Sequence, residues 1–342
     1  MKEPKAVVEP ESGQQASQGK KERFIVQPCR DPDDPNFFSE FLTTDTLFTV
    51  RNEITIYGVE IGRGGHGRIH LGRVNGKPYL SAVKWQTTGK NTLNYYNELR
   101  FLCTCRGWTG FPKICGAAED NSHLAVAMEL LGPSLESLFN SCGRSFSIKT
   151  LCLVADQVLT RLECLHSKGY VHRDMKPDNL VIGNERSNVS TIYLIDFGNV
   201  KRFVDEKKQH IPERRNNVVG TVRYMSINAH NGKEMSRRDD LMSLFYILFY
   251  FMKGALPWQG NSQDTLSKTL TVVNELKVKH TPSLVAESPL EFRQYHEYVD
   301  RLAFADNPDY TYLRGLFQNL AARKNIVMDN IFDWTAESMK FF

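Results

Sequence analysis

The stretch that decides the fold is YVHRDMKPDNL, residues 170–180. It carries the pattern H-R-D-x-x-x-x-N, which places Asp174, Lys176 and Asn179 at set intervals. A carboxylate at Asp174 can orient the proton of an attacking hydroxyl, and a lysine two residues later can neutralise phosphate charge. The amide oxygen of Asn179 is a hard ligand of the kind that magnesium prefers. The spacing therefore predicts a site that moves phosphoryl groups.

A second acidic motif follows this stretch. The apolar run IYLI, residues 192–195, predicts a strand, and Asp196-Phe197-Gly198 comes directly after it. Asp196 would supply a second hard oxygen ligand for Mg2+ beside Asn179.

A glycine-rich loop lies far upstream of both motifs. Gly62, Gly64 and Gly67 stand between Ile61 and Ile69 in the order G-x-G-x-x-G-x-I. Because glycine has no Cβ, such a backbone can close over a polyphosphate and offer N–H donors. Taken alone, the pattern also suits an ordinary hairpin loop. It lies between two strand-like runs, which disfavours a dinucleotide-binding fold, where a helix follows the loop.

A lysine stands in the next apolar run, Ala82-Val83-Lys84. A lysine in an apolar strand is costly unless it is paired. In the functional interpretation Lys84 holds the ATP phosphates and Glu98, inside a helix-like run at 91–105, fixes it by an ion pair. The alternative is an exposed strand lysine and a solvated helix glutamate.

The chain changes character near its middle. Short β-rich runs extend from about 48 to 128, and sequence patterns typical of helices dominate from Ser134 onward. Within the helix-like run at 91–105, Thr92 could be the N-cap. The apolar positions expected to form one face of that helix are Leu93, Tyr96 and Leu99.

Composition excludes several classes of protein. The net charge of +4 over 342 residues is too small for a chain that coats nucleic acid, and 41% hydrophobic residues exclude global disorder. The 7 cysteines contain no C-x-x-C pair, so we expect free thiols in a reducing compartment.

No segment of the sequence has the pattern of a membrane anchor. The N-terminus lacks the apolar stretch of a signal peptide, and the most apolar run, 241–252, is too short to span a bilayer. We interpret 241–252 as a buried central helix and expect a cytoplasmic protein that could also be nuclear. The basic Lys277-Val278-Lys279-His280 is too short for a nuclear import signal, and we expect a solvated loop there.

The motifs resemble those of eukaryotic protein kinases, and further stretches resemble the casein kinase 1 family specifically. These stretches are LLGPSLE at 130–136, SIN at 226–228 where most kinases carry A-P-E, SRRDDL at 236–241, LPWQG at 256–260, PDY at 308–310 and FDW at 332–334. The resemblance runs from about Tyr57 to Trp334.

The resemblance implies an α+β, bilobal protein-kinase fold with a small β-rich N-lobe and a larger helical C-lobe. The predicted divisions are a disordered tail at 1–35, a kinase domain at 36–335 with an N-lobe at about 48–131 and a C-lobe at about 132–335, and a C-terminal end at 336–342.

The resemblance also implies a Ser/Thr protein kinase that uses ATP and Mg2+. It assigns Met128 as gatekeeper and the backbones of Glu129 and Leu131 to adenine binding. The residues that would sandwich the adenine ring are Ile61, Ile69, Ala82 and Leu180.

The segment 196–220 contains no Ser, Thr or Tyr. Many kinases order this segment by a phosphate that pairs with the H-R-D arginine. We therefore predict activity without phosphorylation of this segment. Thr221, the first hydroxyl after it, stands where the family keeps a threonine in the catalytic cleft.

The same segment is rich in basic residues. Arg223, together with Arg214 and Arg215, could form an anion site for acidic or already phosphorylated protein substrates, as the resemblance implies. A solvated run of charges is the alternative. A lysine ahead of Gly220-Thr221 and a lysine-rich turn after Gly260, both typical of the family, are absent here, so the need for a primed substrate stays open. Asn199 stands where a larger apolar residue is common, which leaves its effect on Ser/Thr preference or on loop mobility open.

Two other functions compete with an active kinase. A pseudokinase scaffold would bind partners without turnover, but the complete set of catalytic motif residues disfavours it. A small-molecule kinase is disfavoured by the family resemblance. We expect a monomer that acts on protein substrates, with no direct nucleic-acid partner and no membrane partner.

Overall fold

The computed structural model describes residues 46–64, 67–89 and 92–335. The predicted tail at 1–35, two residues of the glycine loop (65–66) and the C-terminal end at 336–342 lie outside these residues.

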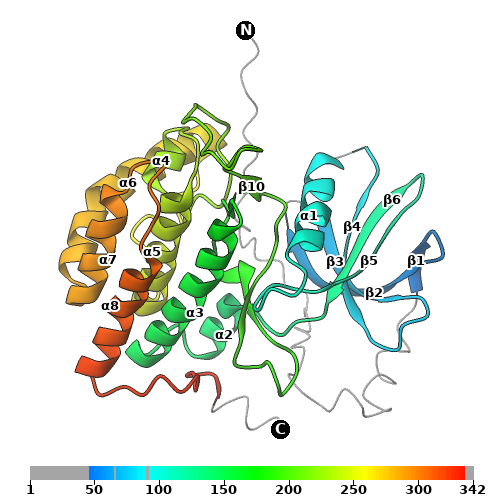
Figure 1. Cartoon of the computed structure of the whole chain (residues 1–342), viewed down its shortest axis with the longest axis horizontal. Coiled ribbons are helices and arrows are strands. Elements are labelled where there is room, and N and C mark those ends of the chain that lie inside the picture. The colour runs from blue at the N-terminus through cyan, green and yellow to red at the C-terminus, as the bar shows by residue number, and fades with distance from the viewer. Residues whose placement is uncertain (1–45, 65–66, 90–91, 336–342) are drawn as a thin grey trace. The chain divides into compact units, whose positions relative to one another are not determined.

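The described residues group into two compact units (Figure 1). The strand-rich unit consists of 46–134 and 180–200, and the helical unit consists of 135–179 and 201–335. The piece 180–200 thus groups with the strands, although it follows the H-R-D stretch in the chain.

A six-stranded antiparallel sheet forms the strand-rich unit, in the order β1-β2-β3-β4-β6-β5. The strands are β1 (Thr46–Val50), β2 (Ile54–Gly64), β3 (Gly67–Val74), β4 (Ser81–Thr87), β5 (Ile114–Glu119) and β6 (His123–Glu129). The predicted β-rich runs are confirmed, and β5 is a strand that the sequence patterns did not indicate. Two short strands, β8 (Leu180–Ile182) and β9 (Ile192–Leu194), pair with each other in the same unit.

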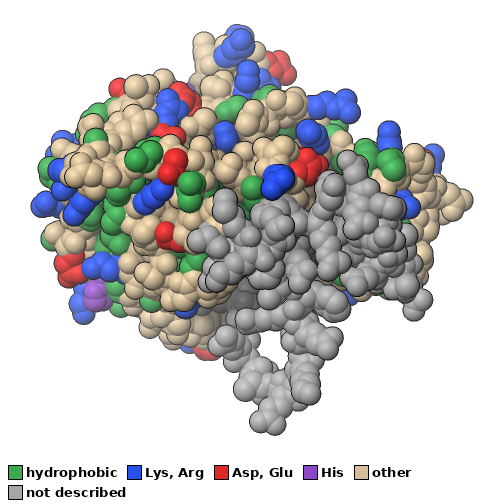
Figure 2. Space-filling model, turned by 90° about the horizontal axis from the view of Figure 1, so that it is seen from below, with side chains coloured by type: hydrophobic (Ala, Val, Ile, Leu, Met, Phe, Trp, Pro, Cys, Tyr) green, Lys and Arg blue, Asp and Glu red, His purple; other side chains and the backbone are tan. Residues whose placement is uncertain are grey.

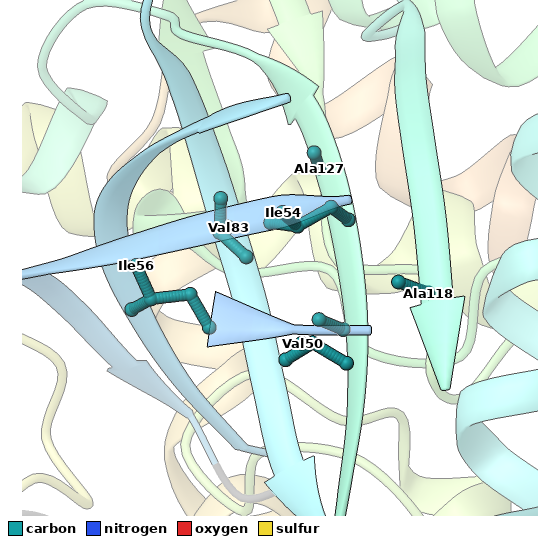
Figure 3. Close-up of a cluster of buried hydrophobic side chains, with 7 residues drawn as sticks. Val50, Ile54, Ile56, Val83, Ala118 and Ala127 are labelled. Atoms are coloured by element: carbon teal, nitrogen blue, oxygen red, sulfur yellow. The ribbon is translucent and has the colours of Figure 1, made fainter. Parts of the chain in front are cut away.

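The core of this sheet is aliphatic. Figure 3 shows Val50, Ile54, Ile56 and Val83 gathered together, with Ala118 and Ala127 beside them. Val83 is fully buried and lies opposite Ala127 on the neighbouring strand. Because side chains alternate along a strand, Lys84 points to the other face of the sheet.

The helix of the strand-rich unit is α1 (Thr92–Thr104), and its predicted apolar face is wrong. Leu93 is 72% exposed and Tyr96 is 39% exposed. The buried positions of α1 are Tyr95, Glu98, Phe101 and Leu102. A buried ion pair of Glu98 and a hydrogen bond from Tyr95 to the Ala125 carbonyl turn this other face inward. Thr92 is itself the first helical residue and not the cap before it.

The helical unit is built around α5 (Arg237–Lys253), which is buried continuously from Asp239 to Phe251. This confirms the predicted central helix. Helices α3 (Ile148–Ser167) and α7 (Leu290–Arg301) pack against α5. Helix α8 (Tyr310–Arg323) packs against α3 and α7. The remaining elements are α2 (Leu135–Ser141), β7 (Tyr170–Val171), η1 (Pro177–Asn179), β10 (Lys201–Arg202), α4 (Ile227–His230) and α6 (Leu266–Ala286).

The solvated loop expected at 277–280 is a second wrong prediction. These residues lie inside α6, and Lys277 is fully buried. Val278 and Lys279, the next two residues, are exposed. Helical geometry separates neighbours in this way, because successive side chains point about 100° apart around the axis.

Six cysteines lie within the described residues and all are free thiols, as expected. None of the helices in 46–335 that the structure describes is long and apolar enough to cross a membrane. Figure 2 shows positive and negative side chains interspersed on the face it presents, in keeping with the small net charge.

Candidate functional site

An ion-paired lysine is the centre of the site in the strand-rich unit. Lys84 Nζ lies 2.8 Å from Glu98 Oε2 and 2.7 Å from Asp196 Oδ1. The side chains of Lys84 and Glu98 are only 8% and 5% exposed. Burial alone would lower the pKa of Lys84, but the Asp196 and Glu98 carboxylates outweigh burial and raise it. Lys84 is therefore a permanent cation between two carboxylates, and the alternative of an exposed strand lysine is excluded.

Aromatic packing fixes the position of the Asp196 motif. Phe197 is fully buried, and its ring lies 4.3 Å from that of Phe101 on α1 and 5.8 Å from that of Phe111. Asp196 itself has a φ of 63°, a left-handed conformation that is uncommon for a residue with a side chain. The buried ring of Phe197 and the ion pair with Lys84 hold Asp196 in this conformation.

The glycine loop is the turn between β2 and β3. Gly62 pairs with Ile69 and Gly64 pairs with Gly67 across this hairpin. Gly67 has a φ of 144°, and a Cβ there would approach the Trp85 carbonyl oxygen to 2.9 Å. Only glycine fits this close approach of two backbones. The described part of the glycine loop is therefore a tight hairpin that depends on glycine at 67.

The residues assigned to adenine lie mostly on neighbouring strands. Ile61, Ile69 and Ala82 are half-buried, and Ala82 lies opposite Met128 in the β4–β6 pair. Leu180 is fully buried at the start of β8. The remaining two positions, whose backbones were assigned to adenine, are Glu129 and Leu131, both half-buried. All seven of these positions belong to the strand-rich unit.

A buried carboxylate shapes the H-R-D stretch in the helical unit. Asp240, near the start of α5, accepts a hydrogen bond from the backbone N–H of His172 at 2.7 Å and another from Arg173 at 2.9 Å. Burial would raise the pKa of Asp240, but hydrogen bonding to His166 and the backbone lowers it. This charge holds Arg173 at a φ of 68° and so sets the direction of the next side chain, Asp174.

Three groups meet at Asp174. Its Oδ1 accepts a hydrogen bond from the Thr221 hydroxyl at 2.7 Å, and its Oδ2 lies 3.3 Å from Lys176 Nζ. Gly220, beside Thr221, has a φ of 102°, and a Cβ there would lie 2.5 Å from the Arg173 carbonyl oxygen. Glycine at 220 is thus what allows Thr221 to approach the carboxylate.

Asn179 lies in η1 and is tied back to the same loop. Its Nδ2 donates a hydrogen bond to the Asp174 carbonyl oxygen at 2.8 Å. Since the amide nitrogen is used inside the loop, the oxygen Oδ1 is the atom that Asn179 can offer to a cation. An amide oxygen at Asn179 and, in the other unit, a carboxylate at Asp196 are each hard ligands of the kind that suits Mg2+.

A residue that the sequence did not indicate supports the loop after Thr221. Lys277 Nζ donates to the carbonyl oxygens of Val222 at 2.8 Å and Met225 at 2.7 Å. The same ammonium lies over the rings of Tyr246 and Trp258. Helical periodicity in the sequence could have identified Lys277 as a buried residue, because the buried positions of α6 recur at helical spacing. They are Thr269, Val273, Lys277, Thr281 and Leu284.

The three arginines of the expected anion site differ in surroundings. Arg223 is half-buried, with its guanidinium over the rings of Tyr224 and Tyr250. Arg214 and Arg215 are exposed on a stretch that runs beside Lys233. The structure thus forms the Lys84 ion pairs within the strand-rich unit and the Asp174 cluster within the helical unit. Among the three arginines, Arg223 is half-buried while Arg214 and Arg215 are exposed.

The chain also matches a known family by sequence. Residues 56–300, well over half of the chain, match the family model described as a protein kinase domain. The match includes the glycine loop, Lys84, Asp174 and Asp196.

Proposed function

The chain belongs to the protein kinase family, and from this premise we propose that it is a Ser/Thr protein kinase of the casein kinase 1 type. The strand-rich and helical units are the two lobes of the α+β kinase fold. The proposed reaction transfers the γ-phosphoryl group of ATP to hydroxyl groups of protein substrates.

The observation that carries the proposal is the buried ion pair of Lys84 with Glu98. This pair and the aspartate of the D-F-G motif must both be in place in an active kinase. A scaffold that never turned over substrate would not need a lysine buried between two carboxylates, because such an arrangement is costly to desolvate.

Each residue has a part in the proposed reaction. Lys84 binds the α- and β-phosphates of ATP while Glu98 orients its ammonium. Magnesium, held by Asn179 and Asp196, would neutralise the phosphate charge.

The helical lobe would supply the groups that act on the attacking hydroxyl. Asp174 orients it and accepts its proton. Lys176 supplies a positive charge against the phosphoryl group as it transfers. Thr221 keeps the Asp174 carboxylate in one orientation through its hydrogen bond.

Substrate preference follows from charge and from the family resemblance. We propose that acidic or phosphorylated segments are preferred, with Arg223 as the main contact and Arg214 and Arg215 as weaker ones. The rigid support under Arg223 favours this ranking. Its backbone carbonyl accepts a hydrogen bond from Trp258 Nε1 at 2.8 Å.

Transfer of the ATP γ-phosphate to casein tests the proposal. The wild-type protein should phosphorylate casein on serine or threonine, and Asp174→Asn should lower the rate by roughly 100-fold or more. Asp264→Asn is the matched control, since Asp264 is an exposed partner of Lys268. If the wild type binds ATP but transfers no phosphate, the scaffold function holds instead. Phosphotyrosine as the product would overturn the Ser/Thr assignment.

A further inference from the structure

A buried carboxylate holds the segment that follows the D-F-G motif. Glu234 lies between α4 and α5 and is 4% exposed. Its Oε2 accepts hydrogen bonds from Lys201 Nζ at 2.7 Å and from Asn216 Nδ2 at 2.9 Å. Lys201 and Asn216 stand near the two ends of the segment 201–217. One carboxylate oxygen thus ties both ends of this segment together.

Backbone hydrogen bonds reinforce the same contact. The Asn216 N–H donates to the Gly232 carbonyl at 2.9 Å, and the Glu234 N–H donates to the Arg214 carbonyl at 2.8 Å. Between them, Arg215 lies opposite Lys233 in an antiparallel bridge. The last part of the segment therefore runs as a short strand beside the residues that carry Glu234.

The first part of the segment pairs with the H-R-D stretch. Lys201 lies opposite Val171 in the β10–β7 pair, two residues before Arg173. Burial lowers the pKa of the Arg173 guanidinium, and the negative charge of Glu234 opposes that effect, ahead of Asp240. The Glu234 charge is therefore felt at the arginine of the catalytic loop.

A phosphate occupies this role in many other kinases. There, a phosphorylated side chain of the segment pairs with the H-R-D arginine and orders the segment. In this chain 196–220 contains no hydroxyl side chain. The charge near Arg173 and Lys201 comes instead from a carboxylate outside the segment.

We propose that Glu234 is a built-in substitute for the activating phosphate: its carboxylate holds 201–217, which pairs with the H-R-D stretch, in the active arrangement without modification. This inference rests on the proposed kinase function and concerns how that function is regulated. Glu234 is a positioning residue, since it acts through Lys201 and Asn216.

Chemical rescue tests the inference directly. Glu234→Ala removes the carboxylate and leaves Lys201 Nζ and Asn216 Nδ2 without their shared acceptor. The rate of phosphate transfer should fall by roughly tenfold or more, because a charge-assisted contact is lost. Inorganic sulfate should restore part of that rate, and chloride at equal ionic strength should not. A residue with only a packing role would not respond to sulfate.

A matched control uses another glutamate of the same region. Glu213 pairs with Arg238 at 2.8 Å and its side chain is 42% exposed. Glu213→Ala should keep the wild-type rate and show no response to sulfate. Glu234→Asp, which keeps the charge on a shorter stem, should retain more activity than Glu234→Ala.

Hydrogen exchange separates this inference from the kinase proposal. Amides of 203–217 should exchange faster in Glu234→Ala, and sulfate should slow them again, whether or not the protein transfers phosphate. If the wild type is inactive, only the kinase proposal fails, and exchange still decides the role of Glu234. The inference would be overturned if Glu234→Ala exchanged its amides and transferred phosphate at the same rates as the wild type. It would also be overturned if the variant lost activity and sulfate restored none of it.

Two further results keep the inference open to contradiction. If Glu234→Ala does not fold, Lys201→Met replaces it, and this variant should also expose 203–217 to exchange; wild-type protection there would count against the inference. Phosphatase treatment of the wild-type protein should leave its rate unchanged. A loss of rate that traces to a phosphate near Arg173 would overturn the built-in substitute.

Discussion

The hydroxyl of Thr221 donates a hydrogen bond to Oδ1 of Asp174 at 2.7 Å. This contact joins the loop after the D-F-G segment to the carboxylate that would receive the substrate proton. Since Lys176 lies at the other oxygen, the two side chains fix the plane of the Asp174 carboxylate. The loop and the catalytic aspartate are therefore ordered together.

Replacing the hydroxyl of Thr221 should slow catalysis. Thr221→Val keeps the shape of the side chain but removes the donor, so we expect kcat to fall by roughly tenfold or more. The KM for ATP should stay near the wild-type value, because the Thr221 hydroxyl bonds to Asp174 and not to the Lys84 ion pairs proposed to bind the phosphates. Thr221→Ser, which restores the donor, should recover most of the rate. Steady-state kinetics of the two variants measure this; equal kcat in Thr221→Val and wild type would contradict it.

Removing the buried ammonium of Lys277 should loosen the loop that contains Arg223. Lys277→Met keeps the packing on Tyr246 and Trp258 but leaves the carbonyls of Val222 and Met225 without their donor. The free energy of unfolding should drop by about 1–3 kcal/mol. Lys279→Met is the matched control, because Lys279 is exposed in the same helix. Urea unfolding compares the two, and a similar midpoint for both variants would be evidence against a supporting role.

The stability of the helical unit should fall in mild acid because of His230. Burial, with the Lys277 charge as a second cause, lowers the pKa of His230 to about 2. An unfolded histidine titrates near ~6.5, so the unfolded chain binds an extra proton below that pH. Stability from this histidine is complete above pH ~6.5 and declines as the pH falls toward 2, by up to about 2 kcal/mol at pH ~5.

A variant isolates this contribution from other titrating groups. His230→Gln should lose less stability than the wild type between pH ~7.5 and ~5, by up to about 2 kcal/mol. Urea unfolding at the two pH values measures the difference. The same loss in both proteins would show that His230 is not protonated on unfolding.

Arg223 should discriminate between substrates without affecting the chemical step. Arg223→Ala should lower kcat/KM on a phosphoprimed peptide by roughly tenfold and leave a neutral peptide nearly unaffected, since a charge-assisted contact to the phosphate is lost. Arg214→Ala, at an exposed position, should have a smaller effect. Rates on paired peptides with and without the phosphate test this. Equal losses on both peptides would remove Arg223 from the anion site.

The cluster around Asp174 could be predicted because its spacing is local. Asp174, Lys176 and Asn179 fall within one loop, so a short pattern is enough to place them together, and the structure confirms their contacts. The ion pair of Lys84 with Glu98 could not be identified from local spacing, since it joins a strand to a helix. The sequence indicated it only indirectly, because a lysine in an apolar strand is costly unless a partner neutralises it.

The predictions that failed depended on which face of a helix is buried. In α1 the apolar residues Leu93 and Tyr96 are exposed, while Glu98 points inward to Lys84. In α6 a basic residue, Lys277, is buried because two backbone carbonyls and two aromatic rings surround it. Hydrophobicity counts could not anticipate either case, since each charge is buried by partners far away in the chain.

The sequence by itself determined the kinase family, the glycine loop, the catalytic loop and the absence of a hydroxyl in 196–220. Local spacing carries these features, so they can be identified before the chain is folded. Only the tertiary structure decided which side chains support them: Thr221 on Asp174, Lys277 under the following loop, and Glu234 between Lys201 and Asn216. Each of these contacts joins segments that folding alone brings together, and burial makes their charges strong enough to matter.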